Sequence, residues 1–235
     1  PGGNKGDGLI YQGAFNLFKK TGLEYNLLPY RYNTVFEEFV DQQLDTKTLL
    51  ILGGGGFSHG FNLMVEIVPF LVNKYETVYI LPTTFDISFP PVKKFLEKLP
   101  DHVSIFCRER KSHSDLSKII PPHRLFLDND TAFEFDYSKW RKRSNGVLNA
   151  FRDDEESSEI TLPEGNQDVS AGPDSQWQVL LDTISEYSIV HTNRAHVSIA
   201  AALMGKETHI YPSSYFKQKE IYEYSLAHLN NVFFL

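Results

Sequence analysis

Hydrophobic residues follow two spacings along this chain. Short apolar runs rich in β-branched and aromatic residues have the length of buried strands. These runs are Thr48–Leu52, Thr77–Leu81, Val103–Cys107, Arg124–Leu127, Val147–Phe151, Tyr187–His191 and Thr208–Tyr211. Longer segments with helical spacing lie between them: Leu9–Thr21, Thr34–Gln43, Phe61–Tyr75, Pro91–Leu99, Asp174–Glu186 and Ala195–Met204. Strands that alternate with helices predict parallel sheets with helices packed on them, so the expected fold class is α/β.

A polar segment divides this pattern into two halves. Tyr137–Gly146 is rich in Lys, Arg, Ser, Asn and Gly, which is typical of a hinge. We therefore expect an N-terminal Rossmann-like domain over residues 1–140 and a C-terminal one over residues 141–235. The acidic stretch Asp153–Pro173 is expected to form a long loop, and its composition favours a solvated insertion over a catalytic element.

Composition narrows the class of protein. The 235 residues carry a formal net charge of −7, and 41% of them are hydrophobic. An acidic globular chain does not attract nucleic acid or anionic lipid, so an anion site must be a local cluster of basic groups. Cys107 is the single cysteine, which excludes an internal disulfide and favours a reducing compartment. No apolar run approaches the roughly 20 residues of a membrane span. We expect a cytoplasmic protein. The chain starts at Pro1 and not at an initiator Met, so a membrane anchor before Pro1 stays open as an alternative.

The start of one predicted helix carries charges of the wrong sign for its dipole. Residues 192–205 read as an alanine-rich buried helix that stops at Gly205. A helix start favours Asp or Glu, yet this one carries Arg194 and His196, and it has no acid within the turn. We infer that an anion binds there.

A glycine-rich segment precedes the first predicted helix. The sequence G-G-N-K-G-D-G contains Asn4, Gly6 and Asp7, and such a loop lets backbone N–H groups approach an anion. Its spacing matches neither the dinucleotide fingerprint nor the phosphate loop of nucleotide triphosphatases. A helix cap is the favoured role for Asp7 on sequence alone.

Four consecutive glycines follow the first predicted strand. Gly54 and Gly55 belong to this run, which fits either a tight turn or a ligand held against bare backbone. Both interpretations stay open.

Charged and hydroxyl side chains follow three further strands. Arg108 comes directly after its strand and Ser112 shortly afterwards, and a guanidinium in this position suits a carboxylate or phosphate ligand. Ser214 and Lys217 come after the strand Thr208–Tyr211 and are candidates to complete an anion pocket. The sequence Asp-Asn-Asp that ends at Asp130 resembles a metal-binding motif, but a structural role is favoured and we expect no metal.

Taken in order, these segments resemble the polysaccharide pyruvyltransferase family. The matching segments are G-N-K-G-D-G-L-I, G-G-G-G-F, L-P-T-T, R-E-R-K-S, L-D-N-D-T-A-F and T-N-R-A-H-V-S-I-A-A-A-L-M-G-K, and they run from Gly3 to about Leu226. The resemblance implies two Rossmann-like domains facing a cleft, as in the GT-B-like glycosyltransferase architecture. It also implies transfer of a pyruvyl group from phosphoenolpyruvate onto two hydroxyls of a sugar or polysaccharide, which forms a cyclic ketal without a cofactor.

The resemblance also implies residue roles. The Arg-x-His element of the family falls on Arg194 and His196, the expected catalytic pair, and Asp7 is a candidate to activate an acceptor hydroxyl. The expected substrate-binding residues are Asn4, Gly6, Gly54, Gly55, Arg108, Ser112, Ser214 and Lys217.

Two other functions stay open at this point. One is a glycosyltransferase of the same fold that uses a nucleotide sugar. The other is a carbohydrate- or anion-binding relative without catalytic activity. Stabilisation by phosphoenolpyruvate, by a nucleoside diphosphate or by neither distinguishes the three. The acceptor sugar and the oligomeric state are not predicted.

Overall fold

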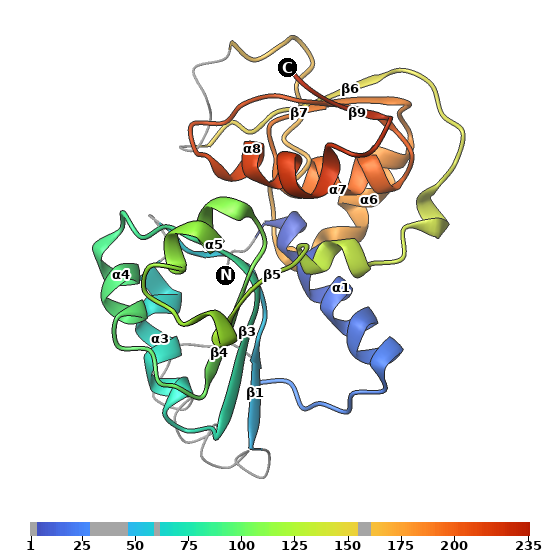
Figure 1. Ribbon diagram of the computed structural model, residues 1–235. Coiled ribbons are helices and arrows are strands. Elements are labelled where there is room, and N and C mark those ends of the chain that lie inside the picture. Colours follow the sequence, from blue (N-terminus) through green and yellow to red (C-terminus); the bar gives the residue numbers. More distant parts are fainter. Residues whose placement is uncertain (1–3, 29–46, 59–61, 155–160) are drawn as a thin grey trace. The chain divides into compact units, whose positions relative to one another are not determined.

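The computed structural model describes residues 4–28, 47–58, 62–154 and 161–235. Within them the chain is α/β and builds two parallel sheets, as predicted (Figure 1). The predicted helix Thr34–Gln43 lies outside the described residues.

The strands form one sheet in each half of the chain. In the first sheet the strands are β1 (Thr48–Ile51), β2 (Gly54–Phe57), β3 (Thr77–Phe85), β4 (Val103–Cys107) and β5 (Leu125–Leu127). Their order is β1-β3-β4-β5, and β2 also pairs with β3. In the second sheet β6 (Val147–Ala150), β7 (Ile189–Thr192), β8 (Glu207–Ile210) and β9 (Val232–Phe234) lie in chain order. All these pairs are parallel.

Helices connect successive strands, as the alternating pattern predicts. They are α1 (Lys5–Thr21), α3 (Asn62–Val72), α4 (Pro90–Leu96), α5 (Arg110–Leu116), α6 (Trp177–Ser185), α7 (Ala195–Leu203) and α8 (Lys217–Ile221). None of the described helices combines the length and the apolar character that crossing a membrane requires.

Close contacts divide the chain into two compact units that differ from the predicted domains. One unit comprises Phe18–Asp130, and the other comprises the residues up to Leu17 together with Thr131–Leu235. The predicted boundary at residue 140 is therefore displaced, and the first helix begins in the second unit. Burial explains the difference, because Leu9 of α1 is fully buried in the same hydrophobic core as the second sheet. The Thr131 hydroxyl also donates to the Ile10 carbonyl at 3.0 Å.

The predicted hinge at 137–146 is packed against the second unit. The Trp140 side chain is buried in the second core, and its indole N–H donates to Asp182 Oδ1 at 2.8 Å. The Lys206 ammonium, which is also buried, donates to the Lys142 carbonyl at 3.1 Å and to the Ser144 hydroxyl at 2.7 Å. These bonds tie the segment to the sheet it precedes.

The alanine-rich sequence of α7 suits its place in the second core. Val197, Ile199, Ala200 and Ala201 are fully buried, so the helix has no exposed face along its middle turns. Small side chains let such a helix lie close to the strands that it connects. Its N-terminus is thereby held firmly at the carboxyl end of β7.

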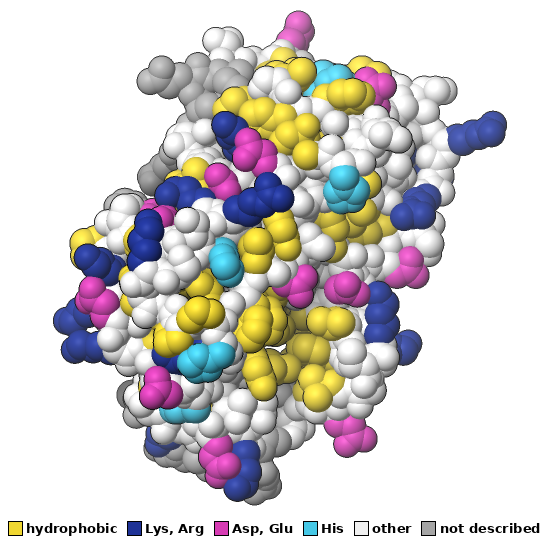
Figure 2. All heavy atoms as spheres, viewed as in Figure 1, with side chains coloured by type: hydrophobic (Ala, Val, Ile, Leu, Met, Phe, Trp, Pro, Cys, Tyr) yellow, Lys and Arg dark blue, Asp and Glu magenta, His cyan; other side chains and the backbone are white. Residues whose placement is uncertain are grey.

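Acidic and basic side chains are interspersed on the face of the molecule shown in Figure 2. This mixture agrees with a moderate net charge of −7. An anion site on this protein is therefore expected to consist of a few basic side chains placed close together and not of a broad basic surface.

Candidate functional site at the carboxyl edge of the second sheet

Strands β6, β7 and β8 end at the same edge of the second sheet, where ligands bind in folds of this kind. Three segments follow these strand ends directly. Arg152 comes after β6, Arg194 and His196 come after β7, and Ser214 and Lys217 come after β8. The start of α1 also lies at this edge, because Gly6 contacts His196.

Backbone and side-chain hydrogen bonds fix the turn between β7 and α7. The Thr192 hydroxyl donates to the Ala150 carbonyl at 2.8 Å and accepts from the Arg194 N–H at 3.0 Å. The Asn193 side-chain oxygen accepts from the Arg152 N–H at 2.9 Å. The ends of β6 and β7 are thus joined, and the two arginines are held as neighbours.

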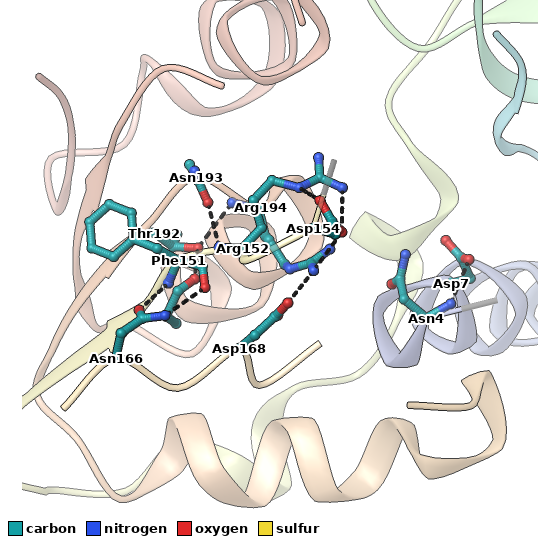
Figure 3. A network of polar contacts seen from close by, with 11 residues as sticks. Asn4, Asp7, Phe151, Arg152, Asp154, Asn166, Asp168, Thr192, Asn193 and Arg194 are labelled. Carbon is teal, nitrogen blue, oxygen red and sulfur yellow. Dashed lines mark hydrogen bonds and ion pairs between the residues drawn. The ribbon is translucent and has the colours of Figure 1, made fainter. Parts of the chain in front are cut away.

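The two arginines bind aspartates from the loop after β6, and they share Asp154. Arg152 binds the Asp154 carboxylate through both Nε, at 2.6 Å, and Nη2, at 2.9 Å. Arg194 Nη2 donates to Asp154 Oδ2 at 2.9 Å and also to Asp168 Oδ2. Figure 3 shows the two guanidinium groups directed at these carboxylates. The four side chains form one ion-pair network.

The two carboxylates of the network differ in their exposure to solvent. The Asp168 side chain is 4% exposed, whereas that of Asp154 is 43% exposed. Burial acts to raise the pKa of Asp154, but the hydrogen bonds and charges of Arg152 and Arg194 outweigh it and hold the pKa at about 2. Asp154 is therefore ionised at neutral pH, and the positive charge of both arginines is balanced within the protein.

This network answers the question raised by the basic helix start. We expected a ligand to balance Arg194, because no acid lies within the helical turn. The structure instead supplies Asp154 and Asp168, which lie 40 and 26 residues from Arg194 along the chain. The composition of Asp153–Pro173 favours a solvated insertion, and this prediction is wrong for Asp168, whose side chain is buried against Arg194.

His196 lies in the first turn of α7, against the first turn of α1. Its side chain is 10% exposed, and Nδ1 lies 4.0 Å from Oδ1 of Asp7. The other oxygen of Asp7, the third residue of α1, accepts from the Asn4 N–H at 3.0 Å, so Asp7 makes a capping bond from within the helix and not from before its start as the sequence favoured. Asp7 thus has one oxygen in a structural bond and the other directed toward the imidazole.

Gly6 and Gly8 lie within α1, not in a loop before it. The helix begins at Lys5, four residues earlier than predicted. A Cβ at Gly6 would lie 2.7 Å from the His196 Cβ and 2.9 Å from its Nδ1. A Cβ at Gly8 would lie 2.3 Å from the Asp174 carbonyl oxygen. These glycines let α1 approach the carboxyl edge closely, which is a packing role that the loop interpretation missed.

Ser214 lies between β8 and α8, and Lys217 lies where α8 begins. Ser214 is exposed, and Lys217 is the first residue of α8, where its ammonium lies 5.6 Å from the centre of the Tyr215 ring. The next residue, Gln218, donates to the Ser198 hydroxyl of α7 at 3.3 Å. The start of α8 therefore packs on α7 beside the turn that carries His196.

Arg108 belongs to the other unit and is enclosed there. Its side chain is 1% exposed and donates to Asp130 Oδ2 at 2.6 Å and to the Thr84 hydroxyl at 2.8 Å. The expectation that it reaches into a ligand site gains no support from these contacts, which assign the guanidinium to an internal ion pair. Asp130 is likewise engaged by Arg108, which agrees with the structural role favoured from the sequence.

Ser112 is also buried in this unit. Its hydroxyl donates to the Phe85 carbonyl at 3.1 Å and accepts from the Phe85 N–H at 2.8 Å. It bonds Glu109 as well, whose carboxylate accepts from the Ser112 N–H at 2.7 Å. These bonds cap α5 and join it to β3, which is a structural use of the side chain.

Gly54 and Gly55 form part of β2, a strand that the sequence did not predict. Gly54 has a φ of 137°, where a side chain would be strained. Its carbonyl accepts from the Thr83 hydroxyl at 3.2 Å, and the Gly55 carbonyl accepts from the Ser58 hydroxyl at 2.7 Å. The preceding Gly53 lies so close to β3 that a Cβ would meet the Pro82 carbonyl oxygen at 1.9 Å. Close packing of the backbone therefore explains why glycine occupies much of this run.

Parallel α/β sheets that gather basic side chains at a carboxyl edge are typical of enzymes that bind anionic substrates. The family model described as polysaccharide pyruvyl transferase matches residues 4–215, so the chain belongs to this family. A crystal structure of a functionally uncharacterized protein from Klebsiella pneumoniae subsp. pneumoniae NTUH-K2044 is similar, with a TM-score of 0.77 and 26% sequence identity. The match covers 100% of this chain and 90% of that one. No curated protein matches the chain.

Proposed function

We propose that this protein transfers the pyruvyl group of phosphoenolpyruvate onto two hydroxyls of a sugar or polysaccharide and forms a cyclic ketal. Membership of the polysaccharide pyruvyl transferase family supports transfer to a carbohydrate. The observation that carries the finer proposal is the position of His196, an acid–base side chain at a helix start beside Arg194 and within 4.0 Å of a carboxylate.

The residues suit the charge of this donor. Phosphoenolpyruvate has a phosphate and a carboxylate, and a helix N-terminus with an adjacent guanidinium favours both. Arg194 occupies the cap position of α7, so the helix dipole and the guanidinium act at the same place. Lys217 at the start of α8 adds a further positive charge at this edge.

His196 is assigned the proton transfer to the donor. A sugar hydroxyl attacks C2 of phosphoenolpyruvate while the CH₂ carbon takes a proton from the imidazolium of His196 and becomes a methyl group, and the neutral imidazole then takes up the proton that the hydroxyl releases. The second hydroxyl then attacks C2, the C–O bond to phosphate breaks, and inorganic phosphate leaves with the proton of that hydroxyl. A histidine suits this step because it exchanges protons near neutral pH.

Asp7 is assigned to orienting His196. A carboxylate that faces one ring nitrogen sets the orientation of a catalytic imidazole and leaves the other nitrogen for the substrate. The 4.0 Å separation is longer than a hydrogen bond, and contacts of this kind often tighten only when substrate binds. The Asn4 N–H holds the second oxygen of Asp7 and so restricts its rotation.

The experiment is a two-stage assay. First, thermal unfolding is measured with millimolar phosphoenolpyruvate or a nucleoside diphosphate, and we expect stabilisation by phosphoenolpyruvate. Second, a panel of sugars is incubated with enzyme and phosphoenolpyruvate, and the products are examined by mass spectrometry. We expect an acceptor whose mass rises by one pyruvate less one water, with release of inorganic phosphate. Stabilisation by nucleoside diphosphate alone would instead indicate a glycosyltransferase.

A further inference from the structure

One carboxylate at the carboxyl edge bridges two arginines, an arrangement that the proposed function does not yet use. Asp154 accepts two hydrogen bonds from Arg152, at 2.6 and 2.9 Å, and its Oδ2 also accepts from Arg194 at 2.9 Å. Two guanidinium groups around one carboxylate form the same contacts that proteins use to hold a phosphate or carboxylate ligand.

The two aspartates of the network are not equivalent. Asp168 is 4% exposed and is held inside the protein, whereas Asp154 is 43% exposed and lies on the solvent side. Replacing Asp154 by a ligand requires movement of a side chain that already reaches solvent. Replacing Asp168 would require an enclosed side chain to leave the protein interior. Asp154 is therefore the member that a ligand is able to displace.

A second observation indicates that the site is incomplete. Within the described parts of the chain, the buried Nε of Arg194 and the buried Oδ1 of Asp168 have no hydrogen-bond partner. The Arg194 side chain is more than nine-tenths buried, with 9% exposed. A buried donor without a partner is costly, and such groups in native proteins often complete their bonds with a ligand or water.

We propose that Arg152 and Arg194 form a two-arginine site for an anionic phosphate or carboxylate group, and that Asp154 occupies this site in the free protein. The incoming anion displaces Asp154 and bonds both guanidinium groups, while Asp168 remains as the positioning residue that holds Arg194. That the anionic group belongs to the donor rests on the proposed function. Arg152 is thereby a binding residue that no sequence motif identified.

The charges of the network favour this exchange. Arg152 and Arg194 carry two positive charges, and Asp154 and Asp168 carry two negative ones. When Asp154 leaves, the remaining three groups have a net charge of +1, which attracts a dianion such as phosphate. While no ligand is bound, Asp154 keeps both guanidinium groups ordered and so reduces the entropy lost on binding.

Asp154→Asn tests this proposal directly, since it removes the competing charge with little change in shape. Titration calorimetry with inorganic phosphate measures affinity without any turnover. We expect phosphate to bind about tenfold more tightly to the variant, which is the effect of losing about one charge-assisted hydrogen bond that competes with the ligand. Asp153→Asn is the matched control, because it removes the same charge from the neighbouring exposed residue, and its affinity should stay within about twofold of the wild type.

Arg152→Gln in the Asp154→Asn background tests the second arginine. We expect this double variant to lose the gain in phosphate affinity. Asp154→Ala repeats the measurement if the Asn variant does not fold. Any of three results would overturn the inference. Phosphate affinity is unchanged by both Asp154 substitutions, it rises equally in Asp153→Asn, or the gain in affinity remains after Arg152 is replaced.

The same variants separate this inference from the proposed function. If Asp154→Asn tightens phosphate binding and no sugar is modified in the presence of phosphoenolpyruvate, the anion site stands and the proposed reaction fails. If ketal forms and Asp154→Asn leaves phosphate affinity unchanged, the reaction stands and the inference about Asp154 fails.

Discussion

Gly6→Ala introduces a single methyl group between α1 and α7. The new Cβ would lie 2.7 Å from the His196 Cβ, and ordinary van der Waals contact begins near 3.4 Å. The difference between these two values means that the helices must separate by about 0.7 Å. Because the obstructing atom is a Cβ rooted in the backbone of α7, rotation of the imidazole does not relieve the contact.

The expected effects on stability and on catalysis differ in size. Alanine gains about 1 kcal/mol in helix propensity over glycine, and overpacking costs about 1–3 kcal/mol, so the free energy of unfolding should fall by at most about 2 kcal/mol. A displacement approaching 1 Å of a catalytic group lowers a rate by up to about 100-fold. We therefore expect kcat for ketal formation to fall about 10- to 100-fold while the protein remains folded.

The matched control is Gly13→Ala in the same helix. There the added Cβ would meet the Thr131 carbonyl oxygen at 1.8 Å, which is a more severe contact than the one at Gly6 and lies at a site without His196. This variant should lower the melting temperature, and its folded fraction should keep the wild-type kcat. Ketal formation measured by mass spectrometry, together with thermal unfolding of both variants, checks the prediction. A wild-type kcat in Gly6→Ala would refute the reasoning that places His196 at this contact.

Three further predictions concern charged side chains. Arg108→Met should lower the free energy of unfolding by about 3–5 kcal/mol because it removes the guanidinium that forms a buried ion pair with Asp130. Arg108→Met combined with Asp130→Leu should recover much of this loss in urea titrations. Lys206→Met should cost about 2 kcal/mol in the same titrations, since it removes a buried ammonium that donates three hydrogen bonds. Asp154 has a folded-state pKa of about 2 against 3.8 for the unconstrained group, so the unfolded state binds more protons between these values. Its contribution to stability is present above pH 3.8 and lost as pH falls to about 2, and Asp154→Asn should flatten this part of the acid unfolding profile.

The sequence predicts the elements that carry a clear apolar pattern of their own. It fails for elements that form through packing against residues far away along the chain. The runs that become β3 and β4 are buried and β-branched, and their strands form as expected. The strand β2 contains three glycines, so it has no apolar alternation to reveal it. The helix α5 has the sequence R-K-S-H-S-D-L, which is too polar to show a helical stripe.

The position of the domain boundary depends on contacts between residues far apart in the sequence. The linker composition around residue 140 suggests a hinge, but composition does not show that Trp140 packs beneath the second sheet. Nor does it show that Leu9 is buried in the same core. The predicted boundary therefore separates segments that fold together.

The candidate site was predicted in part. Arg194 and His196 are detectable because their charge conflicts with a helix start, and the structure places them at the carboxyl edge with Asp7. Asp154 and Asp168 lie in an acidic loop with no spacing signal, so their pairing with arginines is visible only in three dimensions. Arg108 and Arg152 both follow strands and both are buried, and what distinguishes the internal ion pair from the pair at the sheet edge is the exposure of the carboxylate partner, 1% for Asp130 and 43% for Asp154.

The central claim is that the donor binds at the start of α7, where His196 acts on it. The most direct measurement is a crystal structure of the protein with phosphoenolpyruvate, determined in parallel for the wild type and for His196→Gln. We predict that the donor lies within hydrogen-bonding distance of Arg194 in both, with its CH₂ carbon next to the side chain of residue 196, and that only the wild type forms ketal. Density for phosphoenolpyruvate at another site, or ketal formation at the wild-type rate by His196→Gln, would contradict the account.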